Sequence, residues 1–186
     1  RDDRNLHHYG SRCKHGPRFG HIWLTNSELV HSVADKPEGP YVFSDVALLP
    51  RGGRFWHGKM THNPVVRHIG SKYVLYYTGT TYAGPMPTPA TPTTADSPLK
   101  LDAHQHERVG IAVADSPYGP WRRSDKPALD VRPDSWEQYL VSNPCPLVKP
   151  DGSVFLYYKG VERLRTHAIG IARAGSFAGP YERISD

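Results

Sequence analysis

The sequence predicts an all-β protein built from one repeated unit, and three observations lead to this prediction. A phrase of the form Ala-Asp-x-Pro-x-Gly-Pro-aromatic occurs at Ala34–Tyr41 and Ala114–Trp121, with a looser copy at Ala174–Tyr181. An Asn-Pro dipeptide begins at Asn63 and again at Asn143, and a run of β-branched and aromatic residues follows each one. The third observation is composition, because 17 glycines and 18 prolines suit short strands and tight turns better than helices.

Each unit is interpreted as four antiparallel strands. Strand A follows Asn-Pro, strand B ends in Tyr-Tyr-x-Gly, strand C is a run such as Val109–Val113, and strand D follows Gly-Pro-aromatic. Repeated units of four antiparallel strands are the blades of a β-propeller. A partial first unit is expected to have strand B at His21–Thr25 and strand C at Leu29–Val33, after little strand signal in 1–20. We therefore predict about three blades of a propeller of the five-bladed type, with a β-sandwich as the less favoured alternative.

The 186 residues are interpreted as a single partial propeller domain. Residues 82–107 interrupt the second unit between strands B and C, and their many prolines and threonines predict a loop insertion without its own core. Three blades do not close a ring. We expect the chain to be a piece of a longer protein or, as the alternative, to self-associate or have a partner chain that completes the propeller.

Composition and charge argue against several classes of protein. The net charge of +5 is scattered along the chain, whereas nucleic-acid-binding proteins gather basic residues on one face. No apolar run reaches transmembrane length. We therefore expect neither a nucleic acid nor a membrane as partner. No signal peptide is visible, and a secreted or periplasmic location is expected. Cys13 and Cys145 are expected to be free, buried thiols, because their spacing does not indicate a disulfide.

Propeller geometry predicts the site at one mouth of the central channel. The strand A start, the B–C loop and the D-to-A connection all return to this face, and the Gly-Pro-aromatic turns lie on the other. The two connections, Trp56–Pro64 and Trp136–Pro144, align residue for residue. Aromatic rings stack on sugars and polar groups bind hydroxyls, so the mouth suits a carbohydrate. The expected substrate-binding residues are Trp56, His57, Asn63, Trp136, Asn143, Arg163 and His167.

Glycoside hydrolysis needs two carboxyl groups that flank the bond. Glu28 and Glu137 are the best-placed carboxylates, and Asp134 and Glu107 are reserves, although each taken alone also suits a salt bridge. His62 is the third catalytic candidate, since an imidazole at the mouth can exchange a proton. A supporting role beside the Asn-Pro turn is an equal alternative for His62. Glu137 is the preferred carboxyl, with His62 or Glu28 opposite it.

His104 and His106, with Asp102 and Glu107 beside them, are the residues that most resemble metal ligands. They lie in the expected loop and have no second ligand pair at a typical spacing, so a solvated loop is the favoured interpretation. We expect no metal site and no cofactor, with a structural cation in the central channel as the one alternative.

The blade motifs resemble those of family 43 glycoside hydrolases and, more broadly, of five-bladed propeller hydrolases that act on arabinan, xylan and marine galactans. The resemblance covers about residues 20–186 and depends on the Asn-Pro starts, the Ser71–Tyr77 strand, the Ile169–Ala172 strand and the Gly-Pro-aromatic turns. It implies a general-base Asp, a pKa-tuning Asp and an acid Glu at strand A starts. Here the two visible starts carry asparagine, so these three residues do not map onto the chain.

Three functions follow as hypotheses from these observations. The first is hydrolysis of a glycosidic bond in an oligo- or polysaccharide at the channel mouth. The second is carbohydrate binding without catalysis, which the asparagines at the strand A starts favour. The third is a protein-interaction propeller, which predicts no sugar binding.

Overall fold

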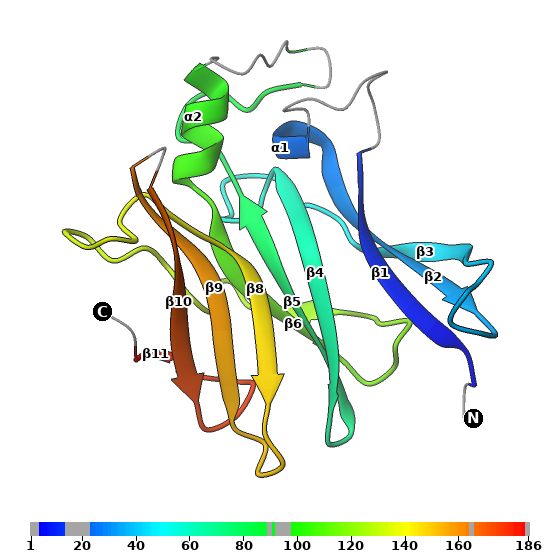
Figure 1. Cartoon of the computed structure of the whole chain (residues 1–186). Coiled ribbons are helices and arrows are strands. Elements are labelled where there is room, and N and C mark those ends of the chain that lie inside the picture. Colours follow the sequence, from blue (N-terminus) through cyan, green and yellow to red (C-terminus); the bar gives the residue numbers. More distant parts are fainter. Residues whose placement is uncertain (1–3, 14–22, 89–90, 92–97, 164–165, 185–186) are drawn as a thin grey trace.

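Eleven strands form three antiparallel sheets within the described residues, which are 4–13, 23–88, 91, 98–163 and 166–184 of this computed structural model (Figure 1). The first sheet, blade 1, contains β1 (Leu6–Cys13), β2 (Ser27–Ala34) and β3 (Val42–Leu48). Blade 2 contains β4 (Met60–Ile69), β5 (Lys72–Thr80), β6 (Arg108–Ala114) and β7 (Arg122–Arg123). Blade 3 contains β8 (Leu140–Val148), β9 (Val154–Arg163), β10 (Thr166–Ala174) and β11 (Glu182–Arg183). The predicted architecture of about three propeller blades is confirmed.

The sequence prediction of strand B in blade 1 is wrong. Trp23–Asn26 forms the single-turn helix α1, and the rest of the predicted strand, His21 and Ile22, lies outside the described residues. Strand B is instead β1, which pairs along its whole length with β2, from Leu6 opposite Ala34 to Cys13 opposite Ser27. Backbone pairing holds β1 in place although its side chains are mostly polar, which is why its propensity was too weak to reveal it.

The stretch 82–107, expected to be a loop, contains the helix α2 (Pro98–Gln105). Proline is well accommodated at the first position of a helix, where its missing N–H is not needed. The helix buries Ala103 against Leu24, Met60 and Tyr82 in a small apolar cluster. Both α1 and α2 lie at the end of the molecule at which β4 and β8 begin (Figure 1). Neither described helix has the length and apolar character that crossing a membrane requires.

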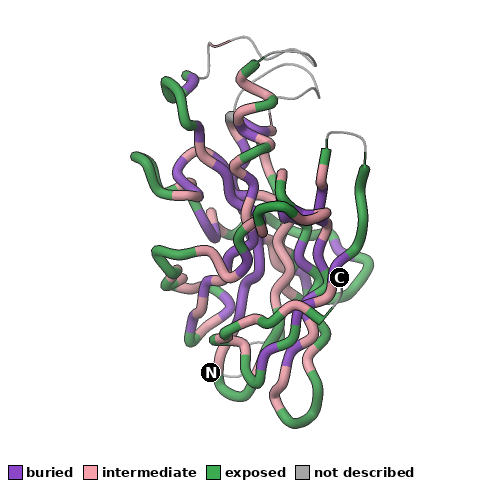
Figure 2. The backbone as a smooth tube through the Cα atoms, turned by 90° about the vertical axis from the view of Figure 1, so that its left-hand side faces the viewer, coloured by how far each residue is buried: buried purple, intermediate pink, exposed green. Residues whose placement is uncertain are grey.

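Two apolar clusters join the blades face to face. The cluster between blades 1 and 2 contains Leu29, Ala47, Leu48, Leu75, Tyr77 and Ala112. The cluster between blades 2 and 3 includes Val74, Tyr76, Val109, Val141, Leu156 and Tyr158. The neighbours Tyr76 and Tyr77 of β5 therefore pack against opposite blades, because successive residues of a strand point to opposite faces. Figure 2 shows these buried segments running through the middle of the described chain.

The repeated Gly-Pro-aromatic phrase forms the turn between strands C and D in each blade, as predicted. Gly39, Gly119 and Gly179 have φ angles of 79°, 85° and 80°, a region that favours glycine. A Cβ atom on Gly39 would lie only 2.8 Å from the backbone nitrogen of Tyr41. The phrase therefore serves the fold, at the opposite end of the strands from α1 and α2.

Both cysteines are free thiols, as expected, but they are exposed rather than buried. Cys13 ends β1, and Cys145 lies on the face of blade 3 that points away from blade 2. The expectation of burial was wrong for Cys145 because that face of blade 3 has no neighbour within the described residues, and for Cys13 because it lies at the exposed end of a strand.

Candidate functional site

The candidate site is an open hollow of about 570 Å³ where β1, β4 and β8 meet at the end that carries α1 and α2. We call this end the mouth. The hollow is lined by Gly10, Ser11, His62, Asn63, Pro64, Val65, Asn143 and Pro144. Three residues expected at the channel mouth from the sequence, His62, Asn63 and Asn143, are thus brought together. Ser11 was missed because β1 itself was missed.

The two asparagines occupy equivalent bulges at the starts of β4 and β8. Asn63 and Asn143 have φ angles of 50° and 54°, and the strand pairing shifts at both places. Asparagine tolerates this left-handed conformation better than most residues, which explains the repeated Asn. The Asn63 side-chain amide donates to the Asn143 side-chain oxygen over 2.6 Å. The two strand starts are therefore linked across the hollow.

Each bulge is also held by a hydroxyl of the preceding blade. The backbone N–H of Asn63 donates to Ser11 Oγ over 2.9 Å, and that of Asn143 donates to Thr78 Oγ1 over 2.9 Å. Ser11 is in strand B of blade 1, and Thr78 is in strand B of blade 2. The same joint is therefore built twice from the same kinds of group.

His62 is the titratable group of the hollow. Its Nδ1 lies 2.7 Å from the buried Ser27 hydroxyl, and the Trp23 ring stacks on it with centroids 5.0 Å apart. Burial lowers the pKa of His62, and the nearby Glu107 opposes this only in part. The imidazole is therefore neutral at neutral pH. Since Nδ1 is committed to Ser27, proton exchange with a ligand would use Nε2.

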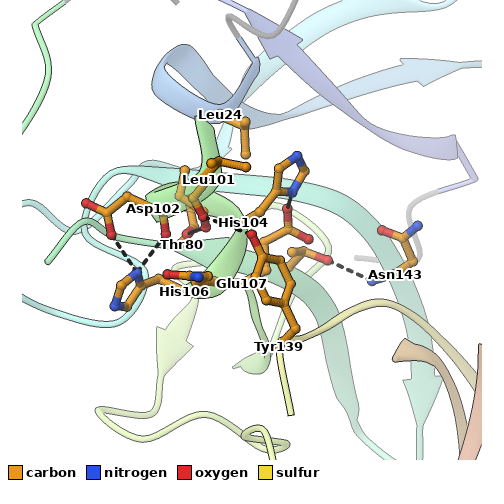
Figure 3. Close-up of polar contacts among 12 residues, drawn as sticks. Leu24, Thr80, Leu101, Asp102, His104, His106, Glu107, Tyr139 and Asn143 are labelled. Atoms are coloured by element: carbon orange, nitrogen blue, oxygen red, sulfur yellow. Dashed lines mark hydrogen bonds and ion pairs between the residues drawn. The ribbon is translucent and has the colours of Figure 1, made fainter. Parts of the chain in front are cut away.

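A second histidine pair borders the mouth on and beside α2 (Figure 3). His104 Nδ1 donates to Glu107 over 2.6 Å, and Glu107 is almost fully buried. Trp23 meets the His104 ring edge to face, with centroids 5.6 Å apart, so it bridges His104 and His62. Trp23 was missed as a site residue because the sequence placed it inside a strand.

His106 and Asp102 pair separately from these residues. The His106 Nδ1 lies 3.0 Å from Asp102 Oδ1, and Asp102 also accepts the backbone N–H groups of Ala83 and Gly84. Among the described residues, no three His, Cys, Asp or Glu side chains gather as metal ligands would. These contacts fasten α2 to the segment that follows β5.

Glu28 lies beside the mouth but faces away from His62. It is 2% exposed and forms an ion pair with Arg12, which is directly opposite it on β1. Neighbouring residues of a strand point to opposite faces, so Glu28 points away from the side on which Ser27 contacts His62. The structure therefore does not bring these two catalytic candidates together.

The tryptophans of the two connections are half-buried and pack at the joints between blades. Trp136 packs so close to β9 and β10 that a Cβ atom on Gly160 would lie 2.2 Å from its ring, and one on Gly170 2.8 Å. Trp56 packs in the same way on Gly79 and Gly110. Each tryptophan thus explains the glycine that ends the Tyr-Tyr-x-Gly motif. Both rings contact protein where the sequence suggested that they would stack on a sugar.

Glu137 and His57 follow these tryptophans and are fully buried. Glu137 forms ion pairs with Arg183 and, over 3.3 Å, with Arg132. These two cations compensate the buried carboxylate, so its surroundings favour a structural role over the catalytic one expected from the sequence. Glu137 does not line the hollow, and Trp23 and Ser27 border it only through their contacts with His62.

His57 occupies the equivalent position beside a different set of partners. Its Nδ1 lies 2.9 Å from the Tyr77 hydroxyl. Burial first, and then the positive charges of Arg123 and Arg51, lower its pKa to about 4. His57 is therefore neutral and bound to Tyr77, whereas Glu137 contacts two arginines, so the two residues differ because their joints offer different partners.

The remaining expected residues lie around blade 3. Arg163 is exposed at the end of β9, next to Glu162. His167 is exposed on β10 and shares a second hollow, of about 450 Å³, with Asn143 and Lys159. The reserve carboxylate Asp134 is exposed in the turn before Trp136.

Comparison with known proteins finds no match by sequence but clear matches by fold. No family model matches the sequence, and no curated protein is similar to it. In three dimensions the chain is similar to Zg3597, a family 117 glycoside hydrolase of the marine bacterium Zobellia galactanivorans. The TM-score is 0.72 at 19% identity, over 97% of this chain and 52% of that one. The fold is that of the propeller glycoside hydrolases.

Two further solved structures of carbohydrate-cleaving enzymes are also similar to this chain in fold. Fructan 1-exohydrolase IIa from Cichorium intybus gives a TM-score of 0.67 at 15% identity, over 98% of this chain and 30% of that one. CoXyl43, a family 43 β-xylosidase/α-arabinofuranosidase from a compost microbial metagenome, gives a TM-score of 0.59 at 19% identity. The match covers 98% of this chain and 56% of that one. The chain spans about half the length of Zg3597 and CoXyl43.

Proposed function

We propose that the chain forms part of a five-bladed, glycoside hydrolase-like propeller that binds a carbohydrate at the mouth and hydrolyses a glycosidic bond there. The observation that carries the proposal is the set of Trp23, His62 and Ser27 beside the linked asparagines. An aromatic face, a neutral imidazole and side-chain amides are the groups that sugar recognition uses. The likeness to glycoside hydrolases supports the same substrate class.

We propose that His62 is the residue that transfers a proton. Its lowered pKa keeps the neutral form abundant at neutral pH, which suits a base that takes a proton at Nε2. Trp23 fixes the plane of the ring, and Ser27 fixes Nδ1. In this proposal Glu137 holds the joint between blades, and Glu28 belongs to the face of blade 1 that points away from blade 2.

Carbohydrate binding without catalysis is the second candidate function. Hydrolysis uses two carboxyl groups around the bond, and no carboxylate is among the residues that line the hollow. Under hydrolysis, the carboxyl groups would come from blades other than the three described. A secreted or periplasmic location and a role in polysaccharide degradation belong to the hydrolase proposal.

The test compares two substitutions in the wild-type background, Trp23→Ala at the mouth and Trp136→Phe at the joint. Binding is measured by calorimetry against plant and algal oligosaccharides, and turnover by release of reducing sugar. We expect Trp23→Ala to weaken binding by up to about tenfold, since one aromatic stacking contact contributes about 0.5–1.5 kcal/mol. Trp136→Phe should leave affinity unchanged. Binding without turnover would select the second candidate, and equal effects of both variants would contradict a site at the mouth.

A further inference from the structure

A further hollow, of about 400 Å³, lies at the joint between blades 2 and 3, at the end of the strands away from the mouth. Its walls are β6, β7 and the segment after β7 on one side, and the Gly-Pro turn of blade 3 on the other. We call it the turn hollow, and its lining includes Ile111, Arg122, Ser124, Lys126, Phe177 and Tyr181. Blades 2 and 3 each have four described strands, so both walls lie within the described residues. Small-molecule sites typically have volumes of about 300–1,000 Å³, so the turn hollow can hold a ligand.

The joint between blades 1 and 2 has a tyrosine ring where the turn hollow lies at the next joint. The repeated phrase makes Tyr118 and Ala178 equivalent, since each directly precedes the glycine of its turn. Tyr118 meets the ring of His31 with centroids 5.2 Å apart. His31 and Ile111 are equivalent, because each lies three residues before the alanine that ends strand C. Ala178 and Ile111 both line the turn hollow, so the space corresponds to the ring that alanine lacks.

The apolar wall of the turn hollow is fixed by contacts with the core. Ile111, Phe177 and Tyr181 pack against the apolar cluster between blades 2 and 3. The Tyr181 hydroxyl donates to the carbonyl oxygen of Phe177 over 3.2 Å and lies 3.1 Å from the Tyr76 hydroxyl. Aromatic rings that are already fixed offer contact area to a ligand with little further loss of side-chain entropy.

The polar rim of the turn hollow is positively charged. Arg122 lies 3.2 Å from Asp115, but Lys72 pairs with the same carboxylate, so two cations share one negative charge. Lys126 adds a third cation, and no carboxylate is among the described residues that line the hollow. Ser124 Oγ accepts the backbone N–H of Lys126 over 3.1 Å and so fixes the turn that carries this lysine. An anionic group is the ligand that compensates such a rim.

We propose that the turn hollow is a second carbohydrate site, which binds an acidic sugar residue of a polysaccharide, either a uronate or a sulfated pyranose. The sugar ring lies against Phe177 and Tyr181, and Arg122 and Lys126 bind its anionic group. The net charge of +5 attracts an acidic polymer to the chain. The inference rests on the carbohydrate class proposed for the mouth, but not on hydrolysis there, since the two hollows share no lining residue.

Filling the turn hollow tests its location. Ala178→Tyr gives blade 3 the ring that Tyr118 gives blade 2, and Ala178 is exposed, so the variant should fold. The Ile111 methyl signals are followed by NMR during titration with oligogalacturonate and with a sulfated galactan oligosaccharide. We expect Ala178→Tyr to weaken binding at least tenfold, whereas Ala178→Ser, which keeps the space, should bind as the wild type does. Saturable shifts with either probe identify the anion. No shift with both probes, or unchanged affinity in Ala178→Tyr, would overturn the proposal.

Reversing one charge tests the ligand class. Lys126→Glu should weaken binding of the acidic probe about tenfold or more, because it removes a charge-assisted hydrogen bond and adds repulsion. Lys36→Glu makes the same change in net charge on the exposed turn of blade 1 and is the matched control. Equal losses in the two variants, or equal affinity of the turn hollow for a neutral xylan oligosaccharide, would contradict the assignment.

Trp23→Ala separates this proposal from the function proposed for the mouth. The Ile111 shifts with the acidic probe should be the same in Trp23→Ala as in the wild type. Loss of these shifts in Trp23→Ala would assign the acidic sugar to the mouth and overturn the second site. Neutral oligosaccharides that fail to bind by calorimetry would count against the mouth alone, because the Ile111 shifts report on the turn hollow.

Discussion

The two connections that lead into β4 and β8 each begin with a half that packs at a joint between blades and end with a half that lies at the mouth. Trp56 and His57 begin one, Trp136 and Glu137 begin the other, and all four pack within the joints between blades. The ends of the same segments form the mouth, where the two asparagines meet. Residue types suited to sugar binding therefore occur in both halves, but only the second half lines the hollow. The comparison teaches that alignment of the repeats locates a loop, whereas packing against neighbouring strands decides which of its residues can reach the hollow.

Of the substitutions that test this comparison, Trp136→Ala should cause the largest loss of stability. Removing the ring leaves the space above Gly160 and Gly170 empty, and cavities of this kind cost about 4 kcal/mol. Trp23→Ala, at the mouth, should cost clearly less and act on binding instead. Urea unfolding followed by circular dichroism measures both variants. A smaller loss of stability for Trp136→Ala than for Trp23→Ala would contradict the assignment of Trp136 to the joint.

Glu137→Ala should cause the next largest loss of stability. It leaves Arg132 and Arg183 without the carboxylate that compensates them, and breaking such a buried pair costs about 3 kcal/mol. Glu137→Gln keeps the shape and should cost less. The catalytic hypothesis drawn from the sequence instead predicts normal stability and lost turnover for Glu137→Gln, so stability and turnover measured together on the complete protein separate the two roles.

His57 should make stability depend on pH. Its pKa is about 4 in the folded chain and about 6.5 when unfolded, so the unfolded state binds more protons between these values. Stability from this group is complete above pH 6.5 and is lost as pH falls toward 4, by about 3 kcal/mol in all. Urea midpoints at several pH values measure the slope. His57→Gln should flatten it, and an unchanged slope in that variant would assign the pH dependence to other groups.

Much of the fold, but less of the site, could be predicted from the sequence. Gly-Pro turns and Asn-Pro starts carry backbone requirements that only a few residues meet, such as the positive φ of Asn63, so they are visible as motifs. The β1 strand is held by pairing rather than by propensity, and it was missed together with Ser11. Trp56 and Trp23 have the same chemistry. Trp56 packs against Gly79 at a joint, whereas Trp23 packs on the small cluster around Ala103 and stacks on His62 at the mouth, and this difference exists only in the folded chain.

The asparagine bulges should give the smallest effect. Asn143→Ala forces a left-handed backbone on a residue that avoids it and should cost about 1 kcal/mol, whereas Asn143→Gly should be nearly neutral in backbone strain. Both variants lose the link to Asn63 equally, so their difference isolates the backbone. Thermal unfolding of the pair measures it. Equal stability of the two would show that strain at the strand start is unimportant.

The most direct test of the central claim, that the mouth rather than the joint binds carbohydrate, is an NMR titration with oligosaccharides. The indole N–H of Trp23 and Trp136 and the ring carbons of His62 and His57 are followed together. The account predicts saturable shifts of Trp23 and His62 on addition of a bound sugar, while Trp136 and His57 stay unchanged. Shifts confined to Trp136 and His57, or no shift of Trp23 and His62 with a sugar that binds by calorimetry, would contradict it.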